Sequence, residues 1–135
     1  MFAGEIKVRD LPDAWNDLSR SLLGLEPTNA AQGVLQDVHW SGGAFGYFPS
    51  YCLGNMIAAQ LWAAVRRAQP DLENDFSRGD FSRLLSWLRE RIHRHGRRWD
   101  TRELIREVTG ENISPAHLVK YLGERYGEIY LPATR

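Results

Sequence analysis

The chain has 135 residues, the size of one ordinary domain and too short for two sizeable cores. Hydrophobic residues make up 43% and charged residues 25% of it, which excludes a collagen-like or largely disordered protein. Lys plus Arg and Asp plus Glu balance at 17 each, so the chain as a whole lacks the strong positive field of a nucleic-acid or anionic-membrane binder. We therefore expect one compact domain over residues 1–135.

The N-terminal part predicts one helix followed by a long irregular loop. Asp10 can cap this helix and Gly24 stands just past its end. Its expected apolar face carries Leu11, Trp15, Leu18 and Leu22. Residues 25–49 are rich in glycine and proline, and only a short apolar–polar piece at 34–40 interrupts them. Structured loops of this length are often functional.

The longest predicted helix covers residues 50–69. Nine of the ten residues from Met56 to Val65 are apolar, whereas a membrane span needs roughly 20. This segment is therefore predicted to be a buried helix and not a membrane anchor. Because it leaves almost no polar face, we expect it at the centre of the fold with apolar neighbours on every side.

Two capped helices are predicted after it. Asp80 can cap the first, which ends near Gly96. Its apolar stripe carries Phe81, Leu84, Leu85, Leu88 and Ile92. Asp100 and Glu103 form a D-x-x-E capping pair for a short second helix, and Gly110 stops it. The apolar residues of this second helix are Leu104, Ile105 and Val108.

A last helix is predicted to begin at Ser114 and Pro115. The residues expected to face inward are Val119, Leu122 and Tyr126. No alternating run rich in valine or isoleucine argues for a sheet. The fold class is therefore predicted to be all-α.

The histidines form no recognisable metal-binding pattern. His93 and His95 are two residues apart, which places them about 200° apart on a helix, so they cannot share one ion. Glu90 and His93 make a single E-x-x-H, but the di-iron pattern needs two such motifs. The zinc motif H-E-x-x-H, phosphate loops and nucleophile elbows are absent from the sequence. We therefore expect no metal ligand and no cofactor in the isolated chain.

Eight arginines between Arg83 and Arg106, with two tryptophans among them, make the one local basic concentration. A nucleic-acid face is one interpretation. Four acidic residues are interspersed, however, and the arginines wrap around two predicted helices instead of forming one stripe. This arrangement favours a solvated, salt-bridged surface, so nucleic-acid binding is expected to be weak and non-specific.

The densest candidate for chemistry is the segment from Gln36 to Trp40 with the residues that follow it. In an extended segment Asp37 and His39 point to the same side, so that a carboxylate can orient an imidazole. Tyr47 and Tyr51 could supply phenolic donors. The alternative is that Asp37 and His39 serve only as structural hydrogen-bonding residues.

These residues also carry a family resemblance. The string GVLQDVHWSGGAFGYFPSYCLGNMIAAQ, residues 33–60, resembles the G-x-x-Q-D-x-H-W motif and following segment of the carboxypeptidase Taq family of zinc-dependent metallocarboxypeptidases. The resemblance continues on both sides of this string and covers essentially the whole chain. It corresponds only to the last part of the family, whose H-E-x-x-H helix and third, glutamate ligand lie upstream and have no counterpart here.

The resemblance implies an all-helical fold and a loop that lines the substrate cleft in full-length relatives. Matching position by position assigns to this cleft Gln36, Asp37, His39, Trp40, Tyr47 and Tyr51. In the family such residues are expected to make polar contacts with the peptide or with the developing oxyanion. Gly42 stands where a polar residue is expected and Ser50 where threonine is usual, which fits relaxed demands on the loop.

Two functions follow from the resemblance. The first is a catalytically silent, stand-alone homologue that acts through self-association or a protein partner. The alternative is one piece of a split or truncated metallocarboxypeptidase, which removes C-terminal amino acids from peptides when an H-E-x-x-H-bearing piece is present. Whether Met1 is the native start stays open.

The composition also predicts an interface and a compartment. An all-apolar helix and five tryptophans are hard to shield within 135 residues, so we expect a homodimer or another protein partner, with Trp62 or its neighbours near the contact. Cys52 is the only cysteine and the N-terminus resembles no signal peptide, so the expected location is the cytoplasm.

Overall fold

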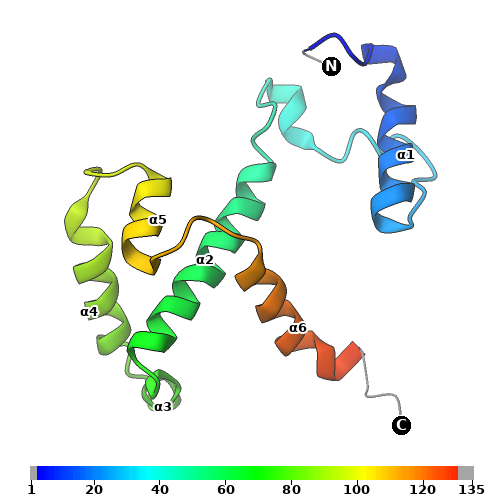
Figure 1. The fold of residues 1–135 in the computed structure, drawn as a ribbon. Helices are drawn as coiled ribbons and strands as arrows, with labels where there is room; N and C mark the ends of the chain where they lie inside the picture. The colour runs from blue at the N-terminus through cyan, green and yellow to red at the C-terminus, as the bar shows by residue number, and fades with distance from the viewer. Residues whose placement is uncertain (1–2, 131–135) are drawn as a thin grey trace. The chain divides into compact units, whose positions relative to one another are not determined.

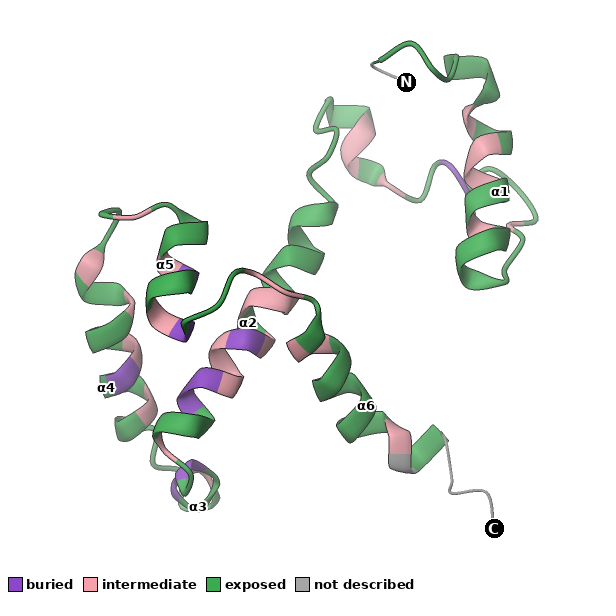
Figure 2. Cartoon of the chain, viewed as in Figure 1, coloured by how far each residue is buried: buried purple, intermediate pink, exposed green. Residues whose placement is uncertain are grey.

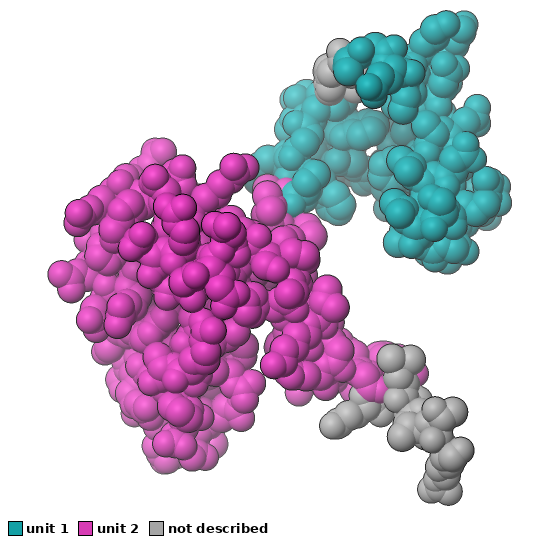
Figure 3. All heavy atoms as spheres, in the orientation of Figure 1, with its two compact units in different colours: residues 1–49 teal, residues 50–135 magenta. Residues whose placement is uncertain are grey.

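The computed structural model describes residues 3–130, with the side chain of Glu128 excepted. No β-strand occurs in this range, and the predicted all-α class is confirmed. The chain divides into two compact units, residues 1–49 and 50–135 (Figure 3). The helices, labelled in Figure 1 where there is room, are η1 (Val8–Asp10), α1 (Leu11–Leu23), η2 (Val38–Gly42), α2 (Pro49–Ala68), α3 (Leu72–Ser77), α4 (Ser82–Arg91), η3 (His93–His95), α5 (Thr101–Thr109) and α6 (Ala116–Tyr130). The single domain over residues 1–135 stays a prediction.

In the first unit α1 begins and ends close to where the sequence predicts. Gly24 closes it with a φ of +66°, the left-handed conformation that glycine adopts without strain, and its amide donates to the Arg20 carbonyl. The prediction that the Asp10 side chain caps this helix is wrong, because Asp10 is the N-cap residue but its side chain makes no capping hydrogen bond. Instead the short 3₁₀ turn η1 leads into α1, and the Asp10 amide donates to the Lys7 carbonyl.

The expected apolar face of α1 is only half covered. Leu11 and Trp15 are partly buried, whereas Leu18 and Leu22 are 58% and 76% exposed. The only buried residues that the structure describes in this unit are Gly33 and Val34, in the loop after α1. The first unit therefore has very little core of its own.

The second unit is built around α2. Its core cluster joins Ala64 and Val65 of α2 to Leu72 of α3 and Trp87 of α4. In Figure 1, α4 and α5 lie to one side of α2 and α6 to the other, and the buried segments in Figure 2 concentrate on α2 to α5. The expectation of apolar neighbours on every side of α2 is wrong, because Asn55, Ala58 and Arg66 of this helix are exposed.

Gln60 is the single polar residue in the apolar run of α2, and it is 1% exposed. Its Nε2 donates to Thr109 Oγ1 and to the Asn112 carbonyl, each at 3.1 Å. Its Oε1 accepts from the Ser114 amide at 3.2 Å. A buried amide needs such partners, and these fasten α2 to the connection between α5 and α6.

The other helix ends follow local chemistry. The capping box of α5 is confirmed, since Asp100 accepts from the Glu103 amide at 2.9 Å and Glu103 accepts from the Asp100 amide at 3.3 Å. Asp80 Oδ1 accepts from the Ser82 amide at the start of α4, and hydrogen bonds from the Ser82 hydroxyl and from this amide lower the pKa of the Asp80 carboxyl. Ser114 Oγ accepts from the Ala116 amide at the start of α6.

Three expectations for the second unit need correction. Helix α3 was not predicted. The helix expected to continue to Gly96 ends at Arg91, and the separate 3₁₀ turn η3 follows it. The residues of α6 expected to face inward, Val119, Leu122 and Tyr126, are instead 66%, 43% and 46% exposed. No helix among the described residues is long and apolar enough to cross a bilayer.

Candidate functional site

The site loop, which we define as residues 25–48, is ordered by short-range contacts. Gly33 is buried, and a Cβ atom there would lie 3.2 Å from Pro27 Cβ and 3.3 Å from Asn16 Oδ1, so a larger residue would be crowded. Its carbonyl accepts from the Gln36 amide at 2.9 Å. The extended segment expected around Asp37 and His39 is wrong, because residues 38–42 form η2.

Asp37 and His39 form the centre of the candidate site. Asp37 Oδ1 accepts from the His39 amide at 3.0 Å, as an N-cap, and lies 2.6 Å from His39 Nδ1. The Asp37 side chain is 8% exposed and the His39 side chain 24% exposed. Because a carboxylate can only accept, the proton of this contact is assigned to Nδ1. The carboxylate therefore fixes the ring orientation, as the spacing predicts, although the backbone achieves it with a helical turn.

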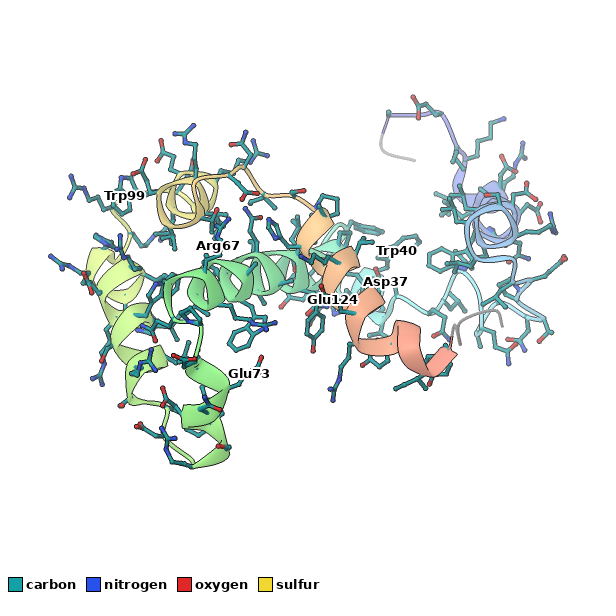
Figure 4. The ribbon with its side chains drawn as sticks, turned by 60° about the horizontal axis from the view of Figure 1, so that its bottom comes forward. Asp37, Trp40, Arg67, Glu73, Trp99 and Glu124 are labelled. Carbon is teal, nitrogen blue, oxygen red and sulfur yellow. The ribbon has the colours of Figure 1, made fainter. Side chains whose placement is uncertain are left out.

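Aromatic rings surround this pair. The Tyr47 and Phe48 rings lie 4.9 and 6.0 Å from the His39 ring, centroid to centroid. Trp40, labelled with Asp37 in Figure 4, packs edge-on against Trp15 of α1 at 6.2 Å. Trp15 thus ties the loop to α1. The apolar stripe of α1 indicated that Trp15 would make such a contact, since the apolar face of an amphipathic helix packs against another part of the protein.

Two further matched residues, Gln36 and Tyr51, lie on either side of this pair in the sequence. The Gln36 side chain is turned toward its own loop, where its amide donates to the Ala31 carbonyl. Tyr51 lies on α2 in the other compact unit and is 54% exposed. The roles of all six matched residues in a substrate cleft stay predictions.

The described residues do not fit a zinc site. Within residues 3–130 no group of three or more His, Cys, Asp or Glu side chains is placed to hold a metal ion. Glu90 belongs to α4 and His93 to η3, so the single E-x-x-H does not even lie on one continuous helix.

The arginine concentration is less paired than expected. Arg83 binds the buried Asp75 carboxylate at 2.8 Å, an ion pair within the second unit. Among the described residues, the other seven arginines of this cluster form no ion pair, so the salt-bridged surface expected there is wrong. The Arg98 guanidinium instead lies 5.2 Å from the Trp99 ring centroid (Trp99 is labelled in Figure 4).

Comparison with known proteins decides the family. The family model of the carboxypeptidase Taq (M32) metallopeptidases matches residues 1–126. The chain belongs to this family. The resemblance that the Q-D-x-H-W segment suggested is thereby confirmed for the chain as a whole.

Individual relatives agree with this assignment. The chain is 43% identical to carboxypeptidase 1 of Bacillus subtilis over 131 residues, and 45% identical to thermostable carboxypeptidase 1 of Thermus thermophilus over 130 residues. These matches cover 97% and 96% of this chain but 26% of each relative. The crystal structure of the M32 carboxypeptidase of Deinococcus radiodurans matches with a TM-score of 0.86 at 49% identity, over 95% of this chain and 26% of that one. The chain therefore spans about a quarter of the length of its relatives.

Proposed function

We propose that this chain supplies the substrate-cleft portion of an M32 metallocarboxypeptidase. Alone it hydrolyses no peptide, and it works by association with polypeptide that carries the remaining part of the fold. In that complex it helps to remove C-terminal amino acids from peptides. Zinc would belong to the H-E-x-x-H-bearing piece, because the described residues of this chain do not fit a zinc site.

The Asp37–His39 pair is the observation that carries this proposal. A carboxylate bound to Nδ1 selects one tautomer and one orientation of an imidazole, the arrangement used where a histidine must present its other nitrogen, Nε2, to a substrate. The contact lies inside the Q-D-x-H-W segment and is largely shielded from water.

The proposal is tested by complementation. The part of Bacillus subtilis carboxypeptidase 1 that this chain does not match is co-expressed with the chain, and release of C-terminal amino acids from a peptide is measured. We expect neither part to be active alone and the pair to be active. His39→Ala should lower turnover of the complex by about 10²-fold, the usual size of one proton-transfer or polar contribution.

His93→Ala is the matched control, because His93 is an exposed histidine outside the site loop. It should leave turnover unchanged. A complex that forms but releases no amino acid contradicts the proposed function. Equal turnover of the wild-type and His39→Ala complexes would show that His39 has no role in the proposed function.

A second candidate function is a purely non-catalytic one, in which the chain forms a homodimer. The exposed apolar residues favour it: Leu22 and Leu23 of α1 are 76% and 68% exposed, and Val119 of α6 is 66% exposed. Light scattering at micromolar concentration tests it. A mass of twice 15.5 kDa together with an inactive complementation mixture would replace the first proposal with this one.

A further inference from the structure

Helix α2 has an uncovered face opposite its core face. Asn55, Ala58, Ala59, Trp62 and Arg66 recur along it at the spacing of one helical stripe, i, i+3, i+4, i+7 and i+11. None of these five residues is buried, whereas Gln60, Ala64 and Val65 on the other side are. The stripe extends over 11 residues, which is about 17 Å at 1.5 Å per residue, or three turns.

This stripe is the floor of a groove between α2 and α6. Three adjoining cavities of 770, 510 and 360 Å³ lie along it, and Trp62 of α2 and Tyr121 of α6 line all three. Ala58 and Ala59 add small side chains to the floor, which allow another helix to approach closely. Trp62 also stacks on Phe76 of α3 at 6.0 Å, so its ring is held in place by the core.

Charged residues occupy the rim of the groove, and several of them pair with opposite charges, whereas Arg125 of α6, which also lines it, forms no ion pair with a described residue. Arg66 lies 3.3 Å from Glu73, and Lys120 lies 3.7 Å from Glu124. His117 contacts Glu111 at 3.0 Å and, with Arg67, lowers the pKa of the Glu111 carboxyl. Figure 4 labels Arg67 on α2 and Glu124 on α6. Because Arg66, Arg67, His117 and Lys120 each already have an acidic partner, most of the positive charge at the rim is compensated, which favours an apolar segment over an anion or a nucleic acid.

We propose that this groove is the docking site for an amphipathic helix from the part of the M32 fold that this chain does not span. The inference rests on the proposed function. Its basis is that the chain covers 26% of the Deinococcus radiodurans M32 carboxypeptidase, whose structure matches it with a TM-score of 0.86. A similar fold therefore exists inside a much longer protein, whose additional polypeptide is available to fill a three-turn apolar groove. Trp62 is its central anchor, as buried aromatic residues are at interfaces.

The test measures binding of the chain to the same co-expressed part of Bacillus subtilis carboxypeptidase 1. The segment of that enzyme that this chain matches serves as the positive control, and the binding conditions are those under which it binds. Ala58→Arg places a long charged side chain on the groove floor without disturbing a buried residue. Leu53→Arg is the matched control, because Leu53 is a 48% exposed residue of α2 that does not line the groove. We expect Ala58→Arg to weaken binding by about tenfold or more and Leu53→Arg to leave it unchanged.

A second measurement locates the contact directly. In a Cys52→Ser background, the thiol of Ala58→Cys should react with a maleimide at least about tenfold more slowly in the complex than in the chain alone, and that of Leu53→Cys equally fast in both. Slower labelling at both positions, or at neither, overturns the groove as the docking site. So does absence of co-purification under conditions in which the relative's own segment binds.

The outcomes separate this inference from the proposed function. Binding that Ala58→Arg abolishes, in a complex without peptidase activity, supports the groove and contradicts the function. An active complex that tolerates Ala58→Arg supports the function and contradicts the groove. A homodimer of the chain alone that Ala58→Arg dissociates assigns the groove to a second copy and overturns the proposal.

Discussion

The two compact units are stabilised in different ways. In the first unit side-chain hydrogen bonds join residues that are close in the sequence, as between Arg20 and Glu26, six positions apart. In the second unit Gln60 is bonded to residues 49 to 54 positions away. Burial follows the same division, because Leu72 and Ile105 are 1% and 2% exposed, whereas the first unit buries only Gly33 and Val34 among its described residues.

This difference indicates which contacts order the candidate site. Local contacts shape much of the loop around Asp37 and His39, through an N-cap and two glycine turns, and the contact of Trp40 with Trp15 joins it to α1. They are not enough to hold it firmly, because segments with few buried apolar contacts open easily. We infer that the second unit forms the stable scaffold. The site loop becomes firmly ordered only when further polypeptide packs against it.

Truncation of a core residue in the second unit should have the largest effect. Leu72→Ala removes a side chain that is 1% exposed, and should lower the free energy of unfolding by about 3 kcal/mol through lost burial and the cavity left behind. Urea unfolding followed by far-UV circular dichroism measures it. The matched control, Leu22→Ala on a 76% exposed residue of the first unit, should change stability by less than about 0.5 kcal/mol. Equal losses would remove the distinction between the units.

Loss of the long-range hydrogen bonds should come next. Gln60→Leu keeps the volume of the side chain but leaves the Ser114 amide and the Asn112 carbonyl without their partner. The expected cost is about 2 kcal/mol, measured by urea unfolding. An unchanged stability would show that water satisfies these groups and that the connection after α5 is not fastened by Gln60.

A change in the first unit should remain local. Asp37→Ala removes the N-cap of η2 and the partner of the His39 ring, at a cost of about 1 kcal/mol to the loop. Nitrogen NMR should show His39 shifting from one tautomer toward a mixture. The urea midpoint of the second unit should not move, and a shift comparable with that of Gln60→Leu would contradict the local character of the site.

The smallest expected effect concerns pH. Hydrogen bonds to Ser82 lower the pKa of Asp80 in the folded chain. Its contribution to stability is therefore complete above the unfolded value of about 3.9 and is lost as the pH falls through the lower folded value. The stability difference between the wild type and Asp80→Asn should be largest at neutral pH and should shrink below about pH 4. A difference that grows on acidification would reverse this sign.

Sequence patterns anticipate most of what is local in this molecule. The capping box of Asp100 and Glu103, the end of α1 at Gly24 and the contact of Asp37 with His39 each depend on residues within four positions, so spacing alone predicts them. Helix α3 was not predicted because it has only six residues, Leu72–Ser77, which are too few to show a helical period.

The spacing of apolar residues does not predict which element packs against a given face of a helix. The stripe of α6 around Val119 is amphipathic and was therefore expected to face inward, yet Val119, Leu122 and Tyr126 are exposed. Gln60 is the one polar residue within the apolar run of α2, and its burial depends on the distant partners Thr109, Asn112 and Ser114. Both cases depend on tertiary contacts that a helical period does not encode.

Hydrogen–deuterium exchange, resolved by peptide and measured on the chain alone and in the complementation complex, tests the central claim most directly. In the chain alone the amides of residues 60–65 and 104–109 should exchange slowest, and those of residues 37–48 fast. In the complex the protection of residues 37–48 should rise markedly while that of the core segments changes little. A site loop that is already as protected as the core in the chain alone, or one that gains no protection in an active complex, would contradict the account.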